Sequence, residues 1–422
     1  MSISSYLNQA QRQTAKIFLI TRGGLLLFVP AAFFVIMRVI PDLGGAAPFH
    51  FDPVAQLSGW GHYLFEPWAR WDTGWYLRIA RQGYLRRDGS LAFFPLYPAL
   101  IAPLRFLFAG NRLLTGIFIS LVACLAAFYL LFRLVELDFG AGAARKSVLF
   151  FAVFPTSFFL QAAYTESLFL ALTLGSFYAA RRQHYLLAGA AAGLAAVTRN
   201  TGILLLIPLV ILYMNGRGWN WRRPGAGMLW LLLAPAGLLV WMIILKINFG
   251  SFLMFAAAQS QWGRHVTGPL EGGPLAPLFF GFLDAFRGLG DVIADPLHGF
   301  WPPDTFNAAF LGSAAIIDFG LTAFFVVLGA LAFRRLPLAY AAYGLLVLLV
   351  PLVFSHSVIT AAAGYRQPLL SMPRFLLADF PAFILLGIWG AKRPRLGMIL
   401  ASVSFILMLA LATRFILGEW VA

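Results

Sequence analysis

The residues best suited to chemistry lie in a polar, aromatic stretch from residue 68 to 98, which follows the first long apolar segment. Asp72 stands there between Trp71 and Trp75, where a carboxylate is costly unless it has a task. We therefore interpret Asp72 as a candidate functional acid. An alternative starts from the helical spacing of the tryptophans, which is typical of a helix lying in the membrane–water interface. In that alternative, the Asp72 carboxylate is merely solvated.

A second candidate group consists of arginines at or near apolar segments. Arg199 lies in the middle of one apolar segment, Arg264 follows another, and Arg366 and Arg374 flank the start of a third. Charges at membrane depth are rare and are usually paired or functional. If these side chains converge, they form an anion site, and the guanidinium fork suits a phosphate. The alternative is that each arginine reaches the interface on its own.

A third candidate is the acid of Tyr164-Thr165-Glu166-Ser167, which joins two apolar runs. Glu166 could contact a substrate directly. A threonine followed by an acid is also an ordinary helix start, so both interpretations stay open.

Several classes of chemistry lack their signatures. There is no Gly-x-x-x-x-Gly-Lys-[Ser/Thr] loop, no His-Glu-x-x-His and no Gly-x-Ser-x-Gly, so the sequence does not support ATP hydrolysis, zinc proteolysis or serine esterase chemistry. Glu136-Leu137-Asp138 has the acid-x-acid form of some metal and nucleotide-sugar sites, but in a basic loop we favour an ordinary loop. No pattern requires a metal or another cofactor, and a divalent metal is left unsupported.

Composition determines the setting for these residues. Hydrophobic residues make up 61% of the 422 and charged residues 11%, against roughly 25% charged residues in soluble proteins. The sequence therefore predicts an integral membrane protein with helices as its spans. The net charge of +15 is spread in small clusters between apolar runs, which argues against nucleic-acid binding. The single cysteine, Cys124, excludes an intrachain disulfide and is expected to be a small buried side chain.

The apolar runs predict an all-α bundle, a single domain over 1–422, with about eleven membrane segments. Two long outer loops interrupt them, at 41–112 with the aromatic stretch and at 248–310, and both are expected to carry interfacial helices. The expected spans are 17–40, 113–135, 147–163, 166–180, 185–213, 226–247, 312–333, 336–355, 374–390 and 396–417.

The segment 185–213 is too long for one crossing and has basic residues at both ends. Because short basic loops stay cytoplasmic, we expect a hairpin of two short helices with Arg199 and Asn200 at the turn. A single tilted helix with a buried arginine is the alternative. The hairpin places the N-terminus and the short basic loops inside and both long loops outside.

These residues resemble a known family when they are read in chain order. The motifs are Arg70-Trp71-Asp72-Thr73-Gly74-Trp75-Tyr76, Gly83-Tyr84, Phe93-Phe94-Pro95-Leu96-Tyr97-Pro98, Tyr164-Thr165-Glu166-Ser167-Leu168-Phe169 and Arg199-Asn200-Thr201-Gly202. Together they resemble the PIG-V family, of the GPI mannosyltransferase II type, and its prokaryotic relatives. The family motif more often reads His-Trp-Asp-Gly, so Arg70 and Thr73 depart from it.

The resemblance implies a GT-C type membrane glycosyltransferase. It implies an inverting transfer of a sugar, mannose in this family, from a polyprenyl-phosphate donor to a lipid-linked or cell-surface glycan on the extracytoplasmic face. Asp72 takes the position of the catalytic base. The expected substrate-binding residues are Arg70, Trp71, Glu166, Arg199, Asn200, Arg264, His265, Arg366 and Arg374.

A transporter or flippase of lipid-linked sugars is the competing interpretation, because the same arginines could simply bind phosphate. Transporters often contain an internal repeat that relates their halves. The two long outer loops differ from each other, which favours an enzyme assembled at one face. Frequent arginine and the lack of an Asn-X-Ser/Thr acceptor favour a prokaryotic plasma-membrane protein.

Overall fold

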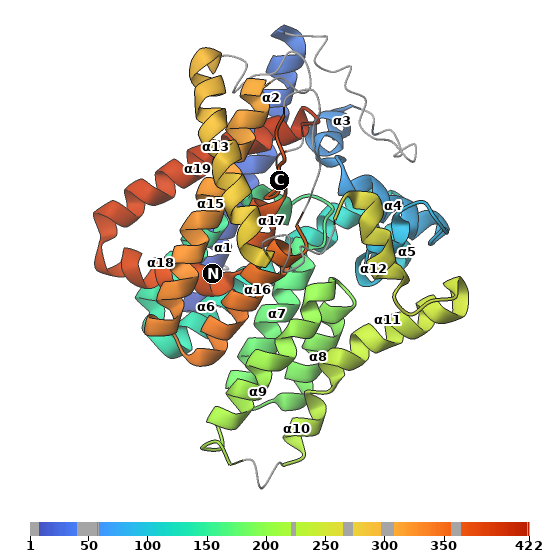
Figure 1. Cartoon of the computed structure of the whole chain (residues 1–422), viewed down its shortest axis with the longest axis vertical. Coiled ribbons are helices and arrows are strands. Elements are labelled where there is room, and N and C mark those ends of the chain that lie inside the picture. The colour runs from blue at the N-terminus through green and yellow to red at the C-terminus, as the bar shows by residue number, and fades with distance from the viewer. Residues whose placement is uncertain are drawn as a thin grey trace, which may run out of the picture.

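The computed structural model describes residues 8–39, 57, 59–220, 225–264, 273–296, 308–355, 364–419 and 421. All of the regular elements in these ranges are helical. They form an elongated bundle in which the α8, α9 and α10 helices lie at one end and the α2, α13 and α15 helices extend toward the other (Figure 1). The predicted all-α chain is confirmed.

The first half of the chain contains two long helical units and several shorter helices. The elements are α1 (Gln9–Phe18), a π-helical turn (Leu19–Gly23), α2 (Gly24–Val39), α3 (Trp60–Phe65), η4 (Glu66–Trp68), α4 (Asp72–Gln82), η5 (Ser90–Ala92), α5 (Leu96–Leu104), η6 (Arg105–Phe108), α6 (Arg112–Ala152), η7 (Ser157–Leu160), α7 (Glu166–Arg181), α8 (Tyr185–Ala196), η8 (Asn200–Leu205) and α9 (Leu206–Asn215).

The second half adds α10 (Gly227–Trp230), α11 (Leu233–Phe249), α12 (Met254–Gln259), η9 (Ser260–Trp262), η11 (Gly273–Leu275), α13 (Ala276–Ala294), α15 (Ala308–Arg335), α16 (Leu338–Val353), α17 (Met372–Phe375), η12 (Leu376–Ala378), α18 (Phe380–Lys392) and α19 (Pro394–Ile416). Among the described residues, five helical units are long and apolar enough to cross a membrane, or six if the bent pair of α17–η12 and α18 counts as one. Shorter apolar helices accompany them. The chain is a membrane protein, as its composition predicts.

Two expected spans do not form continuous helices: 374–390 is bent by 75° between α17–η12 and α18, and 147–163 is interrupted. The α6 helix is broken at Gly140, which has a φ of 85°, and ends at Ala152. Residues 147–163 therefore do not make a continuous helix, because Pro155 lacks an N–H and disfavours helical backbone at the residue before it. The chain continues through the 3-10 turn η7 and enters α7 at Glu166.

The predicted hairpin at 185–213 is confirmed. The Tyr185 and Tyr213 rings, one at each end of the segment, lie 4.8 Å apart between centroids. At the turn, Gly202 packs so closely on the end of α8 that a Cβ would lie 2.4 Å from a backbone atom of Ala195. Arg199 therefore lies at the turn between two short helices.

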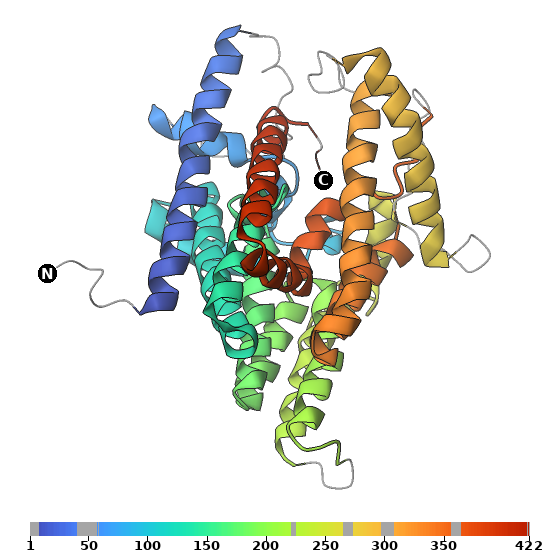
Figure 2. The ribbon, with the colours of Figure 1, turned by 90° about the vertical axis from the view of Figure 1, so that its left-hand side faces the viewer.

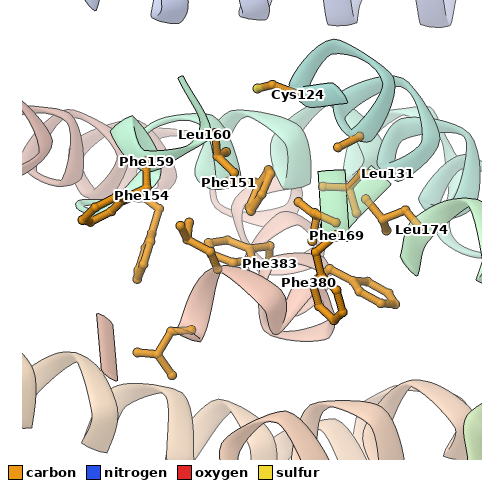
Figure 3. Packing of buried hydrophobic residues seen from close by; sticks show 14 of the residues in the cluster. Cys124, Leu131, Phe151, Phe154, Phe159, Leu160, Phe169, Leu174, Phe380 and Phe383 are labelled. Carbon is orange, nitrogen blue, oxygen red and sulfur yellow. The ribbon is translucent and has the colours of Figure 1, made fainter. Parts of the chain in front are cut away.

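Aromatic packing holds the middle of the bundle together. Phe383 on α18 contacts Phe151 at the end of α6 and Phe154 just after it, with ring centroids 4.9 and 5.2 Å apart (Figure 3). Cys124 is fully buried in the same core, as expected. This packing fixes α18, and with it the preceding α17 turn, against the segment that leads into α7.

The second outer segment contains α13, which lies alongside α15 (Figure 2). Gly288 and Gly312 allow the close approach, since a Cβ on Gly288 would lie 2.5 Å from the Gly312 Cα. The opposite face of α13 is apolar and exposed, with Phe279, Phe286 and Ile293 each more than half exposed.

Candidate active site

The aromatic stretch presents Asp72 at the first position of α4. Trp71 before it has a φ of 50°, which is unusual for a bulky residue and turns the chain sharply into the helix. The Tyr164 hydroxyl donates to the Arg70 carbonyl oxygen at 3.1 Å and accepts the Asp72 N–H at 3.2 Å. A motif from a distant part of the chain therefore sets the Asp72 backbone.

The Asp72 side chain meets an arginine that lies 302 residues further along the chain. Arg374 on α17 donates through Nη1 to Asp72 Oδ2 at 2.8 Å. Both residues are buried, with exposed fractions of 8% for Asp72 and 7% for Arg374. A buried charge needs a partner, and removing one member of such a pair typically costs about 3–5 kcal/mol.

Glu166 joins this pair to the turn of the hairpin. Its Oε1 lies 3.2 Å from Arg374 Nε and accepts from Arg199 Nη1 at 2.6 Å. Arg199 Nη1 also lies 3.3 Å from the Thr165 hydroxyl. Asp72, Arg374, Glu166 and Arg199 thus form a chain of alternating charge, contributed by α4, α17, α7 and the residue before η8.

Arg264 provides a third guanidinium next to Arg199 and Arg374, but its contacts differ from theirs. It lies over the Phe375 ring, 4.8 Å from the centroid, and has no carboxylate within ion-pair distance in the described part of the chain. Burial, with a smaller contribution from Arg374, lowers the pKa of Arg264 to about 10. An anion entering the site would therefore find Arg264 with no acid already bound to it.

Two cavities meet at these arginines. A larger one of about 270 Å³ has an apolar end formed mainly by α16 and the α17–η12 turn, and a smaller one of about 150 Å³ contains Asp72. The residues that line both are Arg199, Asn200, Gln259, Arg264, Arg374 and Phe375. The apolar cavity and the polar cavity therefore share a wall that contains Arg199, Arg264 and Arg374, which we call the arginine wall.

Three of the predicted site residues in the described part of the chain, Arg70, Trp71 and Arg366, do not line either cavity. Arg70 is buried beside Asp72 and burial lowers its pKa to about 10, yet it lines neither cavity. Trp71 donates through Nε1 to the Glu419 carbonyl oxygen at 3.1 Å. Arg366 lies over the Phe280 ring of α13, away from both cavities. His265 lies outside the described residues.

Several residues of the site were not singled out from the sequence. Gln259, Trp262 and Phe375 line the cavities, and Trp262 packs edge-on against Phe93 of the aromatic stretch. Phe375 follows Arg374 directly and lies under both Arg199 and Arg264. A phenylalanine beside an arginine is a weak signal in so apolar a chain, so only the fold identifies it.

The acids of the described residues do not form a metal cluster of three or more ligands. Glu136 and Asp138 lie away from the arginine wall and are paired with Arg133 and Arg181, respectively. Tyr340 also donates to Asp138 at 2.5 Å. The predicted loop is wrong, because both acids lie within the α6 helix (Arg112–Ala152), where they form these ion pairs.

Comparison with known proteins supports the family resemblance. Residues 47–214 match the family model described as Mannosyltransferase (PIG-V). The GPI mannosyltransferase 2 of Yarrowia lipolytica is 26% identical over 206 residues, which cover 48% of this chain and 55% of that protein. The chain thus spans about half the length of the curated relative it matches. The predicted resemblance is confirmed over this segment, which contains Asp72, Glu166 and Arg199.

Solved structures were also found. ArnT from Cupriavidus metallidurans bound to undecaprenyl phosphate has 17% identity and a TM-score of 0.38, covering 94% of this chain and 78% of that one. The archaeal oligosaccharyltransferase AglB from Archaeoglobus fulgidus, in complex with an inhibitory peptide and a dolichol-phosphate, has 13% identity and a TM-score of 0.38. That match covers 95% of this chain and 56% of the other.

Proposed function

We propose that the chain is an inverting glycosyltransferase that moves a sugar, mannose by its family match, from a polyprenyl-phosphate donor to a lipid-linked or cell-surface glycan. One observation carries this proposal. A buried acid, Asp72, and three arginines meet where an apolar cavity joins a polar one. A lipid phosphate with a sugar attached needs such a junction, because its two ends differ in polarity.

The donor fits the two cavities in one orientation. The hydrocarbon chain occupies the larger cavity, where Val347, Val350 and Leu377 provide an apolar lining. The phosphate binds at the arginine wall, and the sugar extends into the smaller cavity beside Asp72. This orientation brings the anomeric carbon, rather than the lipid, toward the candidate base.

Charge complements the shape of the site. Among the described residues that line the two cavities, three guanidinium groups and two carboxylates leave one net positive charge, which matches the single negative charge of a phosphodiester donor. When the phosphate leaves, it gains a second negative charge, and fixed cations stabilise that charge as it develops. Arg374 lines both cavities and so contacts the phosphate from the side of Asp72.

The transfer itself needs one base. An acceptor hydroxyl attacks the anomeric carbon, Asp72 takes its proton, and the bond to the phosphate oxygen breaks with both electrons going to the polyprenyl phosphate. A retaining reaction would need a second free carboxylate as nucleophile. Glu166 is held by two arginines and is poorly placed for that role. A single displacement inverts the anomeric configuration.

The site lies on the extracytoplasmic side in this proposal, with the N-terminus in the cytoplasm. The short basic loops support that orientation, and the chain is placed in the plasma membrane of a prokaryote. The confirmed hairpin supports it too, because both of its ends lie together, away from Arg199 at the turn. A transporter is less well supported, since binding alone gives no use for the acid at the sugar end.

The test is reconstitution of the purified protein in liposomes with polyprenyl-phosphate mannose labelled in the sugar, together with membrane extract as the source of acceptor. Label should move to a glycan or glycolipid, with the anomeric configuration of the new bond opposite to that of the donor. Movement of intact labelled donor between leaflets, with no new glycosidic bond, would replace this proposal with the transporter.

A further inference from the structure

A second cationic cavity lies behind the wall of the candidate site, between the loop after α4 and the α12 helix. Its volume is about 220 Å³. Leu91, Met254 and Ala258 give it an apolar floor, while Arg86 and Arg87 supply its charge. Figure 1 shows α12 beside α4 and α5, with α11 leading up to it. Neither the family motifs nor the proposed transfer uses Arg86 or Arg87.

The local acid does not neutralise these two arginines. Asp88 is turned toward Arg78, with Oδ2 at 2.7 Å from Nη2, and its Oδ1 accepts the Ser90 N–H at 2.9 Å. In the described part of the chain, Arg86 and Arg87 have no carboxylate within ion-pair distance. Both side chains are exposed. The cavity therefore has a rim of uncompensated positive charge.

The surroundings combine cations with exposed apolar side chains, a composition typical of a membrane surface. The apolar α11 helix ends at Phe249, and Arg86 reaches that end, with Nη2 3.6 Å from where a Cβ of Gly250 would lie. Lys246 adds a third cation by donating to the Gly250 carbonyl oxygen at 3.0 Å. Leu253, which follows shortly after Gly250 in the chain, is 57% exposed. Cations beside exposed apolar side chains at the end of a span bind lipid headgroups.

From this placement we propose that the Arg86–Arg87 cavity binds the phosphate of an anionic phospholipid of the surrounding leaflet, with the start of its acyl region against Leu91 and Met254. The bound lipid would stabilise the loop that forms this cavity, and through that loop the candidate site. Trp262 donates to the Gly89 carbonyl oxygen at 3.2 Å, so the cavity loop is attached to a residue that lines the Asp72 cavity.

The test is a binding measurement, so it does not depend on the transfer reaction. The full-length protein in neutral detergent is titrated with phosphatidylglycerol or phosphatidylcholine, and saturable stabilisation is followed as a shift in Tm. Phosphatidylglycerol should raise Tm and phosphatidylcholine should not. In R86Q/R87Q the apparent affinity for phosphatidylglycerol should fall roughly tenfold or more, since each basic residue near a lipid surface contributes about a factor of five.

The control with the same loss of charge is R81Q/R105Q, which changes two arginines of the same outer segment that do not line the cavity. It should bind phosphatidylglycerol like the wild type. An equal loss in both double variants would overturn the proposal, because attraction would then come from the general charge of this face. A shift of the same size with glycerol phosphate alone would also overturn it, since no lipid would be needed.

A second variant covers the case in which R86Q/R87Q folds poorly. Ala257 lines the cavity from the exposed side of α12, so A257W fills the space and leaves both arginines in place. It should abolish the shift with phosphatidylglycerol. An unchanged shift in A257W would show that the lipid binds elsewhere.

Discussion

Replacing Asp72 with asparagine is the most direct perturbation of the proposed mechanism. The amide keeps the size of the side chain and can still accept the N–H of Arg374, which lies 2.8 Å away in the wild type. It cannot take a proton from an acceptor hydroxyl. Arg374 also keeps Glu166, at 3.2 Å, so the substitution does not leave a guanidinium without any acid.

The expected effect on folding is therefore much smaller than the effect on the reaction. Loss of one charged hydrogen bond costs about 1.5–3 kcal/mol, and the remaining acid offsets part of that, so D72N should insert and purify normally. A well-placed general base contributes about 10²–10⁴-fold, and transfer should fall by that factor. D72E should recover little, because moving the carboxylate by about 1 Å can cost around 10²-fold.

The assay is initial-rate transfer from labelled polyprenyl-phosphate mannose, with donor binding and Tm measured on the same samples. Glu66 provides the control, since it lies in the same outer segment, bonded to the Leu57 N–H at 2.7 Å, and lines neither cavity. E66Q should transfer at the wild-type rate. If D72N transfers normally while E66Q does not, the base has been assigned to the wrong residue.

Four other predictions follow from the arginine wall and the topology. R374Q should raise the KM for the donor at least tenfold, and R374K should recover only part of it because the fork is lost; a wild-type KM in R374Q would make this arginine structural. E166Q should weaken donor binding, while E166D restores part of it, because Glu166 orients arginines rather than reacting; unchanged binding in E166Q contradicts this. Arg264 lines both cavities and keeps its positive charge at working pH, so R264Q should raise the KM for the donor about tenfold or more, and an unchanged KM would exclude Arg264 from the phosphate site. A cytoplasm-active reporter should work when fused after Gly216 and be silent after Gly273, and the same result at both positions would refute the orientation.

The membrane class and most helices could be predicted because they depend on local composition. Long apolar runs bury their backbone polar groups only as helices in a bilayer, so hydropathy alone locates them. The hairpin at 185–213 could be predicted too, from its length and its basic ends. The failure at 147–163 has a local cause, since the apolar run continues past Ala152 while Pro155 ends the helix. Mean hydropathy does not register one proline.

The site could be predicted only in part. Asp72, Glu166 and Arg199 lie in motifs, and Arg374 and Arg264 stand out in the sequence because charge is rare near apolar segments. What the pattern could not provide was their pairing, because Arg374 is 302 residues from Asp72 and only the packing of α18 places it there. The same limit applies to Arg366, which is equally conspicuous in the sequence but lies over Phe280. Tertiary packing separates these two arginines.

The pairing explains why so many charges are tolerated in a buried site. Asp72 and Glu166 both lie within ion-pair distance of Arg374, and Glu166 also pairs with Arg199, so the alternating chain offsets part of the desolvation cost. Arg264 stands outside the chain, stabilised mainly by the Phe375 ring. In the described residues the site therefore has one positive charge in excess, which a negative charge next to the apolar cavity would balance. A lipid-linked phosphate supplies that charge together with a hydrocarbon chain for the cavity, whereas a free inorganic phosphate supplies only the charge. This charge imbalance therefore favours binding of the proposed donor.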